Sequence, residues 1–385
     1  EVALALVLLV VSGLMIRTFV AMRQAHPGFT RPEQVQTFQV AIPETLISDP
    51  QQMARAHEQI AERLRQVPGV MSVGVSSSIT MDEEDNMNPL WVEHVNVPEG
   101  QLPPLRRYKS LAPGYFETMG NPVVAGRAIT WTDIYGSRRV VVVTANLARE
   151  YWQDPSGALG KRVRGSPGSE WYEIVGVVGD ERDDGLNQPV TPIVYWPMAD
   201  ESYLQYTMAY AVRSSRVGSP GFLQELRQAV WSVNTHVPLA SVQTLQEIQA
   251  DSLAQTSFAM LMLGIAGGVA LLLGAVGIYG VIAYVAAQRT REIGIRIALG
   301  ARAADVLRMV LGQGVALTAA GIAVGLVAAL AVTRVMRALL YDTSPTDPLT
   351  FAAVVPVLGA AALLACWVPA RRATRADPIA ALRSE

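Results

Sequence analysis

Residues 258–287 read FAMLMLGIAGGVALLLGAVGIYGVIAYVAA, without a single charged side chain. A helix needs roughly 20 mostly apolar residues to cross the hydrocarbon core of a bilayer, so this run predicts a transmembrane helix. Similar runs occupy residues 2–22, 310–332 and 349–368. A water-soluble core can bury one such helix but hardly three closely spaced uncharged ones, so the sequence predicts four membrane spans.

The first run has two interpretations. It carries Arg17 near one end, but a long arginine side chain can extend to the membrane interface, so a span remains compatible with it. A signal peptide is the alternative, although no basic segment precedes the apolar run. The chain begins at Glu1, directly before the run, and we interpret this as a sign that it is a piece of a longer protein.

Composition agrees with a membrane protein. Half of the residues are apolar and 17% are charged, against about a quarter in an ordinary globular protein. The apolar excess lies at the two ends, whereas residues 23–255 have a normal composition. The net charge of −2 gives no reason to expect nucleic acid as a partner. Cys366 is the single cysteine, so no intrachain disulfide can form.

Arginine in the short loops predicts the orientation. The loop between the second and third spans and the tail after the fourth are both arginine-rich: Arg289, Arg291, Arg296, Arg302 and Arg308 in the loop, and Arg371, Arg372, Arg375 and Arg383 in the tail. Both segments are therefore expected in the cytoplasm. The domain between the first two spans is then extracytoplasmic.

That domain alternates strand and helix patterns. Residues 35–42 read as a strand, Asp49 and Pro50 as a helix start, and the spacing of Met53, His57, Ile60 and Leu64 as the helix, before a strand with Val73 and Val75. A second unit has a strand at 206–212, a cap at Ser219 and Pro220, and a helix carrying Phe222, Leu226, Val230 and Val233. Further strands are predicted at 139–144, 171–178 and 193–196.

These patterns predict a multi-pass α-helical membrane protein with a large two-lobed α+β extracytoplasmic domain between the first and second helices. One lobe would be formed from both ends of that domain. The predicted divisions are residues 1–24 for the first helix, 25–250 for the outer domain and 251–385 for the other spans. The last division contains a cytoplasmic loop at 289–305.

No catalytic constellation is visible. The histidines His26, His57, His94 and His236 lack the i, i+4 spacing of a metal site, and His57 lies on the apolar stripe of its helix. The acidic runs 82–85 and 180–184 are interpreted as solvated polar loops. The nearest approach to a phosphate loop, Gly157 with Gly160 and Lys161, has the wrong spacing. The chain is therefore expected to bind no cofactor or metal and to hydrolyse no ATP alone.

Glycines recur at helical spacing in two spans: Gly264 and Gly268 in the second, Gly321 and Gly325 in the third. Small residues four apart let helix backbones approach closely in lipid. We expect such packing within the chain or against a second copy. The alternative is that glycine is simply common in membrane helices.

The loop RTREIGIRIALGA at 289–301 predicts a short amphipathic helix. Glu292 and Arg296 lie one turn apart in the favourable order, Ile293 and Ile297 share another face, and Gly300 permits a turn. Such a helix could lie on anionic headgroups. Alternatively, it could dock onto a cytoplasmic partner.

From this loop the sequence resembles a known family. The run REIGIRIALGA (291–301) and the ending VPARRATRADPIAALR (368–383) resemble the C-terminal domain of FtsX-like ABC permeases. The segments VVVVTANLAREYW (140–152), GKRVRG (160–165) and WYEIVGVVGD (171–180) are similar to the periplasmic core of MacB-like permeases, and ALALVLLVVSGLMIRTF (3–19) to their first span.

The resemblance implies a permease in the bacterial inner membrane that works with a separate cytoplasmic ATPase, which would hold ATP and magnesium. It also implies one lobe inserted in the other, and a coupling element comprising Arg291, Glu292, Ile293, Gly294, Arg296, Ile297, Leu299 and Gly300. MacB itself carries an ATPase domain on the same chain, which this sequence lacks. The match is closer to stand-alone permeases, some of which are duplicated, so a second copy or a fused half is expected.

Three functions follow as hypotheses. The leading one is a permease that converts ATP hydrolysis by its partner into movement of the outer domain, for export or mechanotransmission. The spans offer few polar residues to line a path, so cargo or an outer partner would bind the extracytoplasmic domain. The rivals are an ATP-independent receptor or scaffold and a membrane-anchored enzyme, which would need the constellation that is not visible.

Overall fold

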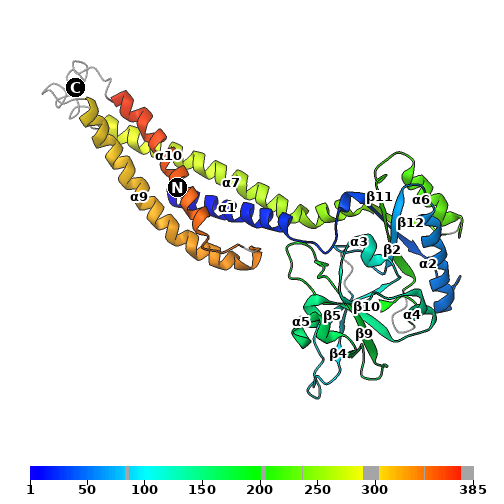
Figure 1. Cartoon of the computed structure of the whole chain (residues 1–385). Coiled ribbons are helices and arrows are strands. Elements are labelled where there is room, and N and C mark those ends of the chain that lie inside the picture. The colour runs from blue at the N-terminus through cyan, green and yellow to red at the C-terminus, as the bar shows by residue number, and fades with distance from the viewer. Residues whose placement is uncertain (83–85, 201–204, 236, 289–302, 342, 374–385) are drawn as a thin grey trace. The chain divides into compact units, whose positions relative to one another are not determined.

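The computed structural model describes residues 1–82, 86–200, 205–235, 237–288, 303–341 and 343–373 (Figure 1). The chain divides into two compact units. One consists of Glu1–Gln24 with Gln255–Glu385, and is called the membrane unit below. The other, Ala25–Ala254, is called the outer domain.

Long helices form the membrane unit: α1 (Val2–Gln24), the greater part of α7 (Leu245–Gln288), α9 (Ala303–Val335), the short η3 (Met336–Leu339) and α10 (Pro348–Ala373). Four apolar segments in them are long enough to cross a membrane: Val2–Gln24, Thr256–Val285, Gly314–Val335 and Pro348–Pro369. The predicted four-span architecture is therefore confirmed.

Helix α1 is the most enclosed span of this unit. In its most apolar window 44% of the residues are buried, against 11% in the span of α7. It packs on α9 and α10. The shared core contains Ala5, Leu6, Val10, Leu14, Ala329, Val354 and Leu358. The first run is therefore a packed helix of this unit.

One lobe of the outer domain, called lobe 1, is built from its two ends. It contains β1 (Val35–Ala41), α2 (Pro50–Arg65), β2 (Val70–Ser76), β11 (Thr207–Ser214), α6 (Phe222–Trp231) and β12 (Leu239–Thr244), preceded by η1 (Pro32–Gln34). The strands lie in the order β12-β1-β11-β2. Each β-α-β unit thus encloses one strand of the other, and α2 packs against α6.

Local signals explain most helix boundaries in lobe 1. Asp49 caps α2 by accepting a hydrogen bond from the Gln52 backbone N–H at 2.7 Å, and Pro50 follows in the first turn, as predicted. The predicted cap of α6 was wrong. Gly221, in a left-handed conformation, precedes that helix without a side-chain cap, and the helix ends at Trp231, before Val233.

Lobe 2 lies between β2 and β11 in the chain. It contains β3 (Met87–Pro89), β4 (Trp91–Val92), β5 (Leu105–Leu111), α3 (Tyr115–Met119), β6 (Val123–Gly126), α4 (Trp131–Tyr135), β7 (Val140–Thr144), α5 (Ala145–Trp152), η2 (Pro155–Ala158), β8 (Arg162–Arg164), β9 (Tyr172–Val178) and β10 (Ile193–Pro197). Its strands continue the sheet as β5-β10-β7-β9-β8-β4, with β3 paired to β5 and β6 paired to β9. Its core includes Val141, Ile174 and Trp196, which are fully buried.

The strands of the two lobes are joined narrowly, although α3 of lobe 2 also packs on β2 and β11. Strands β2 and β5 pair only at Ser76 and Leu111. Since β2 precedes lobe 2 and β11 follows it, lobe 2 is inserted in lobe 1, as the resemblance implied. The sheet is continuous across the joint, but a single residue pair carries the connection there.

Candidate functional site

The turn at residues 180–185 contacts the segment that enters the outer domain from α1. The Arg182 backbone N–H donates to the carbonyl of Pro27 at 3.0 Å. Gly28 has a φ of +97°, and a Cβ there would lie 2.7 Å from the Glu181 Cα. A side chain at position 28 would therefore clash with the turn, so glycine permits this close contact.

A buried ion cluster, formed by Arg107, Lys109, Glu181 and Asp183, anchors this turn to strand β5. The Lys109 ammonium donates to the Asp183 carboxylate and lies 3.6 Å from Glu181; these three side chains are at most 2% exposed. Arg107 lies 3.4 Å from Asp183. Burial opposes a charge on Lys109, but the neighbouring carboxylates outweigh it and hold the pKa of Lys109 above its ordinary value.

Polar neighbours complete the hydrogen bonding of the Glu181 carboxylate. Thr80 donates its hydroxyl to the carboxylate at 2.9 Å, and the Asn121 side-chain amide donates at 3.0 Å. The Asn121 amide also donates to the Gly179 carbonyl at 3.2 Å. A buried charge is tolerated only when it is paired and hydrogen-bonded, and Glu181 meets both conditions. The turn is thus held firmly against lobe 2.

The interpretation of residues 180–184 as a solvated loop was wrong. Glu181 is fully buried and Asp183 is 4% exposed. A signal was present in the sequence: Arg107 and Lys109 stand two apart in one strand, so their side chains share a face. Two basic residues on one face of a buried strand require acidic partners, and Glu181 and Asp183 provide them.

The same turn connects to the start of α7. The Met81 backbone N–H donates to the Asp183 carbonyl at 3.1 Å. The Ser252 hydroxyl on α7 lies 3.5 Å from the Met81 sulfur. A Cβ at Gly185 would lie 3.8 Å from the Ser252 Cβ. Both ends of the outer domain, which continue into α1 and α7, therefore contact one charged turn of lobe 2.

This arrangement is called the junction hereafter. It consists of residues 27–28, 79–82, 180–185 and 251–252, together with the buried ion cluster. Within the described ranges, no group of three or more His, Cys, Asp or Glu side chains could hold a metal ion. His57 is buried in lobe 1, where its Nδ1 lies 2.7 Å from the Tyr210 hydroxyl, so it packs in the core.

The glycines of the spans differ in their surroundings. A Cβ at Gly321 would lie 2.8 Å from the Val2 Cβ, and one at Gly325 would lie 3.0 Å from the Ala3 Cα. No such neighbour lies within 4 Å of a Cβ built at Gly264 or Gly268. In the described part of the chain, Gly264 and Gly268 therefore have no helix against them, and their packing against a second copy stays a prediction.

An ion pair fixes α1 to the start of α10. Arg17 Nη1 lies 2.5 Å from Asp347 Oδ2, with side-chain exposures of 45% and 12%. Asp347 also caps α10 by accepting from the Thr350 backbone at 2.8 Å. Arg17, which the sequence placed at a membrane interface, thus has a specific partner.

The predicted coupling residues are Arg291, Glu292, Ile293, Gly294, Arg296, Ile297, Leu299 and Gly300, and they lie outside the described residues. Of the predicted loop at 289–305, the structure describes only the residues from Ala303, where α9 begins. The role of these residues therefore stays a prediction.

Four membrane spans with a two-lobed domain between the first and second define a class of multi-pass permease-like membrane proteins. Residues 2–251 match the MacB-like periplasmic core domain, and residues 264–378 match the FtsX-like permease C-terminal family. The chain therefore belongs to the FtsX-like permeases with a MacB-like periplasmic core domain, a family of transporter components rather than enzymes.

Two similar proteins are longer than this chain. The pyoverdine export ATP-binding/permease protein PvdT of Pseudomonas syringae pv. tomato is 39% identical over 36% of this chain and 21% of its own length. The macrolide export ATP-binding/permease protein MacB of Rhodospirillum rubrum is 29% identical over 71% of this chain and 42% of its own. The chain thus spans less than half of either relative.

Among solved structures, the chain is similar to the periplasmic region of MacB from Actinobacillus actinomycetemcomitans. The identity is 16%, the alignment covers 60% of this chain and 97% of that one, and the TM-score is 0.39.

Proposed function

We propose that this chain is the membrane subunit of an ATP-driven transporter in the bacterial inner membrane. A separate cytoplasmic ATPase, holding ATP and magnesium, would bind the loop at 289–305. ATP binding and hydrolysis would then move the outer domain, for export or mechanotransmission. The functional unit would contain two such halves, either two copies or one fused chain, with cargo or an outer partner on the outer domain.

The contact of both ends of the outer domain with one turn is the observation that supports this proposal. Residues 27–28 follow α1, and Ser252 lies in α7, so each end continues directly into a span. The buried ion cluster holds the turn rigidly to lobe 2. We infer that a displacement of either span is passed to lobe 2 through this turn. The membership of residues 264–378 in the FtsX-like family supports the entry of ATP-derived work from the cytoplasmic side.

The coupling loop provides the test. Ile293 and Ile297 lie one helical turn apart, and burying two such side chains in a partner is worth roughly 3–6 kcal/mol before association costs. Replacing both with Asp removes this contribution and adds a desolvation cost. The Ile293→Asp, Ile297→Asp variant should reach the membrane at normal levels and lose the ATPase that co-purifies with the unmodified chain.

A conservative variant is the control. Ile293→Leu, Ile297→Leu keeps the apolar patch and the loop arginines, so it should retain the ATPase. If the Asp variant still retains the ATPase and its full transport phenotype, these residues do not form the coupling contact. If the unmodified chain retains no ATPase at all, the receptor or scaffold hypothesis is favoured.

A further inference from the structure

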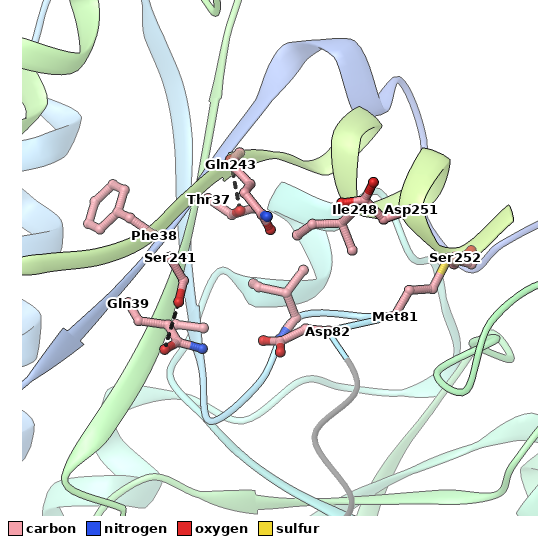
Figure 2. Close-up of a pocket in the computed structure, with 12 residues that line it drawn as sticks. Thr37, Phe38, Gln39, Met81, Asp82, Ser241, Gln243, Ile248, Asp251 and Ser252 are labelled. Carbon is pink, nitrogen blue, oxygen red and sulfur yellow. Dashed lines mark hydrogen bonds between the residues drawn. The ribbon is translucent and has the colours of Figure 1, made fainter. Parts of the chain in front are cut away.

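A cavity of about 330 Å³ opens in the outer domain beside the junction (Figure 2). Strand β1, the loop at 79–82, strand β12 and the first turns of α7 supply its walls. The lining residues are Thr37, Phe38, Gln39, Ile79, Met81, Asp82, Ala209, Ser241, Gln243, Ile248, Asp251 and Ser252. The volume falls within the range of small-molecule sites.

Backbone strain marks two walls of this cavity. Met81 and Ser241 have φ values of +71° and +47°, in the left-handed region that non-glycine residues rarely adopt. The pairing of β1 with β12 also shifts register between Thr37 and Gln39, opposite Ser241. Strained backbone persists where its surroundings hold it, and it concentrates at ligand-binding and switch regions.

Hydrogen bonds hold the bulged wall in place. The Thr37 hydroxyl donates to the Gln243 carbonyl at 2.9 Å, and the Gln36 amide donates to the same carbonyl at 2.7 Å. The Ser241 hydroxyl donates to the Gln39 side-chain oxygen at 3.3 Å, as Figure 2 shows. The wall is therefore formed before any ligand arrives, which lowers the entropic cost of binding.

The lining combines an apolar surface with negative charge. Ile79, Met81 and Ile248 are at most 7% exposed and give the cavity its apolar part. Asp82 and Asp251 are the charged residues of the described lining, in which no lysine, arginine or histidine stands. An anion would meet only repulsion from these carboxylates, whereas a cation would be attracted by both.

We propose that this cavity binds a small organic cation, an amine or guanidinium carried on an apolar body. The carboxylates of Asp82 and Asp251 would hold the charged group, and Ile79, Met81 and Ile248 would contact the apolar body. Binding needs this chain alone. The binding site deepens the proposed function because Asp251 and Ser252 belong to α7. A ligand in the cavity would therefore contact the helix that continues into a span.

Ligand-observed saturation-transfer NMR on the full chain tests this proposal. The chain would be placed in nanodiscs of uncharged phosphatidylcholine, with empty discs as the blank. Phenylbutylamine is the probe, and phenylbutanol and phenylbutyrate are its neutral and anionic analogues. We expect the amine to bind at least about ten-fold more tightly than either analogue, since charge-assisted hydrogen bonds form only with the amine.

Isosteric variants locate the binding. Asp82 accepts a hydrogen bond from the Ile79 backbone at 3.2 Å, and Asp82→Asn retains an oxygen that can accept it. The Asp82→Asn, Asp251→Asn variant should weaken amine binding by about ten-fold. Asp154→Asn, at an exposed residue of lobe 2 outside the cavity, should leave it unchanged. If the double variant does not fold, Asp251→Asn at an exposed position carries the same test.

Three results would overturn the proposal: amine binding no tighter than alcohol binding, unchanged affinity in the double variant, or a signal no larger than that of empty discs. The assay contains no ATPase, so these results leave the coupling proposal untouched. Conversely, amine binding by a chain that retains no ATPase would leave the cavity assignment standing and remove only its link to transport.

Discussion

The two units of this protein use opposite means to hold their parts together. In the outer domain, Lys109, Glu181 and Asp183 are nearly inaccessible, and their charges fix a turn to a strand. In the membrane unit, the core of α1, α9 and α10 is apolar, and Gly321 and Gly325 let α1 approach α9 closely. Removing one partner of a buried ion pair costs far more than the intact pair contributes. The outer domain should therefore be sensitive to charge, and the membrane unit to volume.

The largest effect is expected at Lys109. Lys109→Met leaves Asp183 and Glu181 without the cation between them, and such a loss costs about 3–5 kcal/mol. Denaturant unfolding of the full chain in detergent, followed by the β signal in circular dichroism, would measure the change in unfolding free energy. Arg149→Met is the control, since Arg149 and Asp180 form an exposed pair worth at most about 1 kcal/mol. Equal effects of the two variants would refute a structural role for the buried cluster.

Acid should destabilise the outer domain through His57. Burial lowers the pKa of His57 from 6.5 to about 4, so the unfolded chain takes up the proton first as the pH falls. The stability that depends on neutral His57 is fully present above pH 6.5. It is lost progressively between pH 6.5 and pH 4, by about 3 kcal/mol in total. Unfolding of the full chain at a series of pH values would measure this slope. In His57→Gln the stability lost between pH 6.5 and pH 4 should be smaller by that amount, and an unchanged loss would be evidence against this group.

The membrane unit should respond to added volume at one glycine pair only. A side chain at Gly325 would meet the Ala3 backbone at 3.0 Å and Leu6 at 3.1 Å, so Gly325→Leu should cost about 1–3 kcal/mol. Gly264→Leu, with no neighbour within 4 Å, should cost almost nothing in a single copy. Unfolding in mixed micelles would compare the two variants. If Gly264→Leu is harmless to one chain but disrupts a purified dimer, then Gly264 packs against the second copy.

Much of this architecture could be predicted from sequence because it depends on local composition. An uncharged apolar run specifies a span wherever it occurs, and the cap at Asp49 with its helical spacing specified α2. Which elements lie against each other in space was harder to predict from the sequence. The acidic turn at residues 180–184 was interpreted as solvated. The burial of its side chains depends on Lys109 in β5, which lies more than 70 residues before Asp183 in the sequence.

The glycine pairs show the same limit. Gly264 with Gly268 and Gly321 with Gly325 have identical spacing. In the described chain, however, only Gly321 and Gly325 contact another helix. Spacing fixes which residues share a helix face, but the neighbouring helices decide whether that face is covered. The strained residues Met81 and Ser241 were likewise hidden, since neither residue type indicates a left-handed backbone.

In the proposed function, ATP hydrolysis by a partner moves the outer domain relative to the spans. Double electron-electron resonance can measure it directly, with spin labels at Asp154→Cys in lobe 2 and Val335→Cys at the end of α9, in a Cys366→Ala background. Labelled chains would be diluted with unlabelled ones and reconstituted with the ATPase that co-purifies. The distance between the labels should change between the nucleotide-free and ATP-bound states, and Ile293→Asp, Ile297→Asp should abolish the change. An identical distance in both states, in a complex that hydrolyses ATP at its full rate, would show that hydrolysis does not move the outer domain.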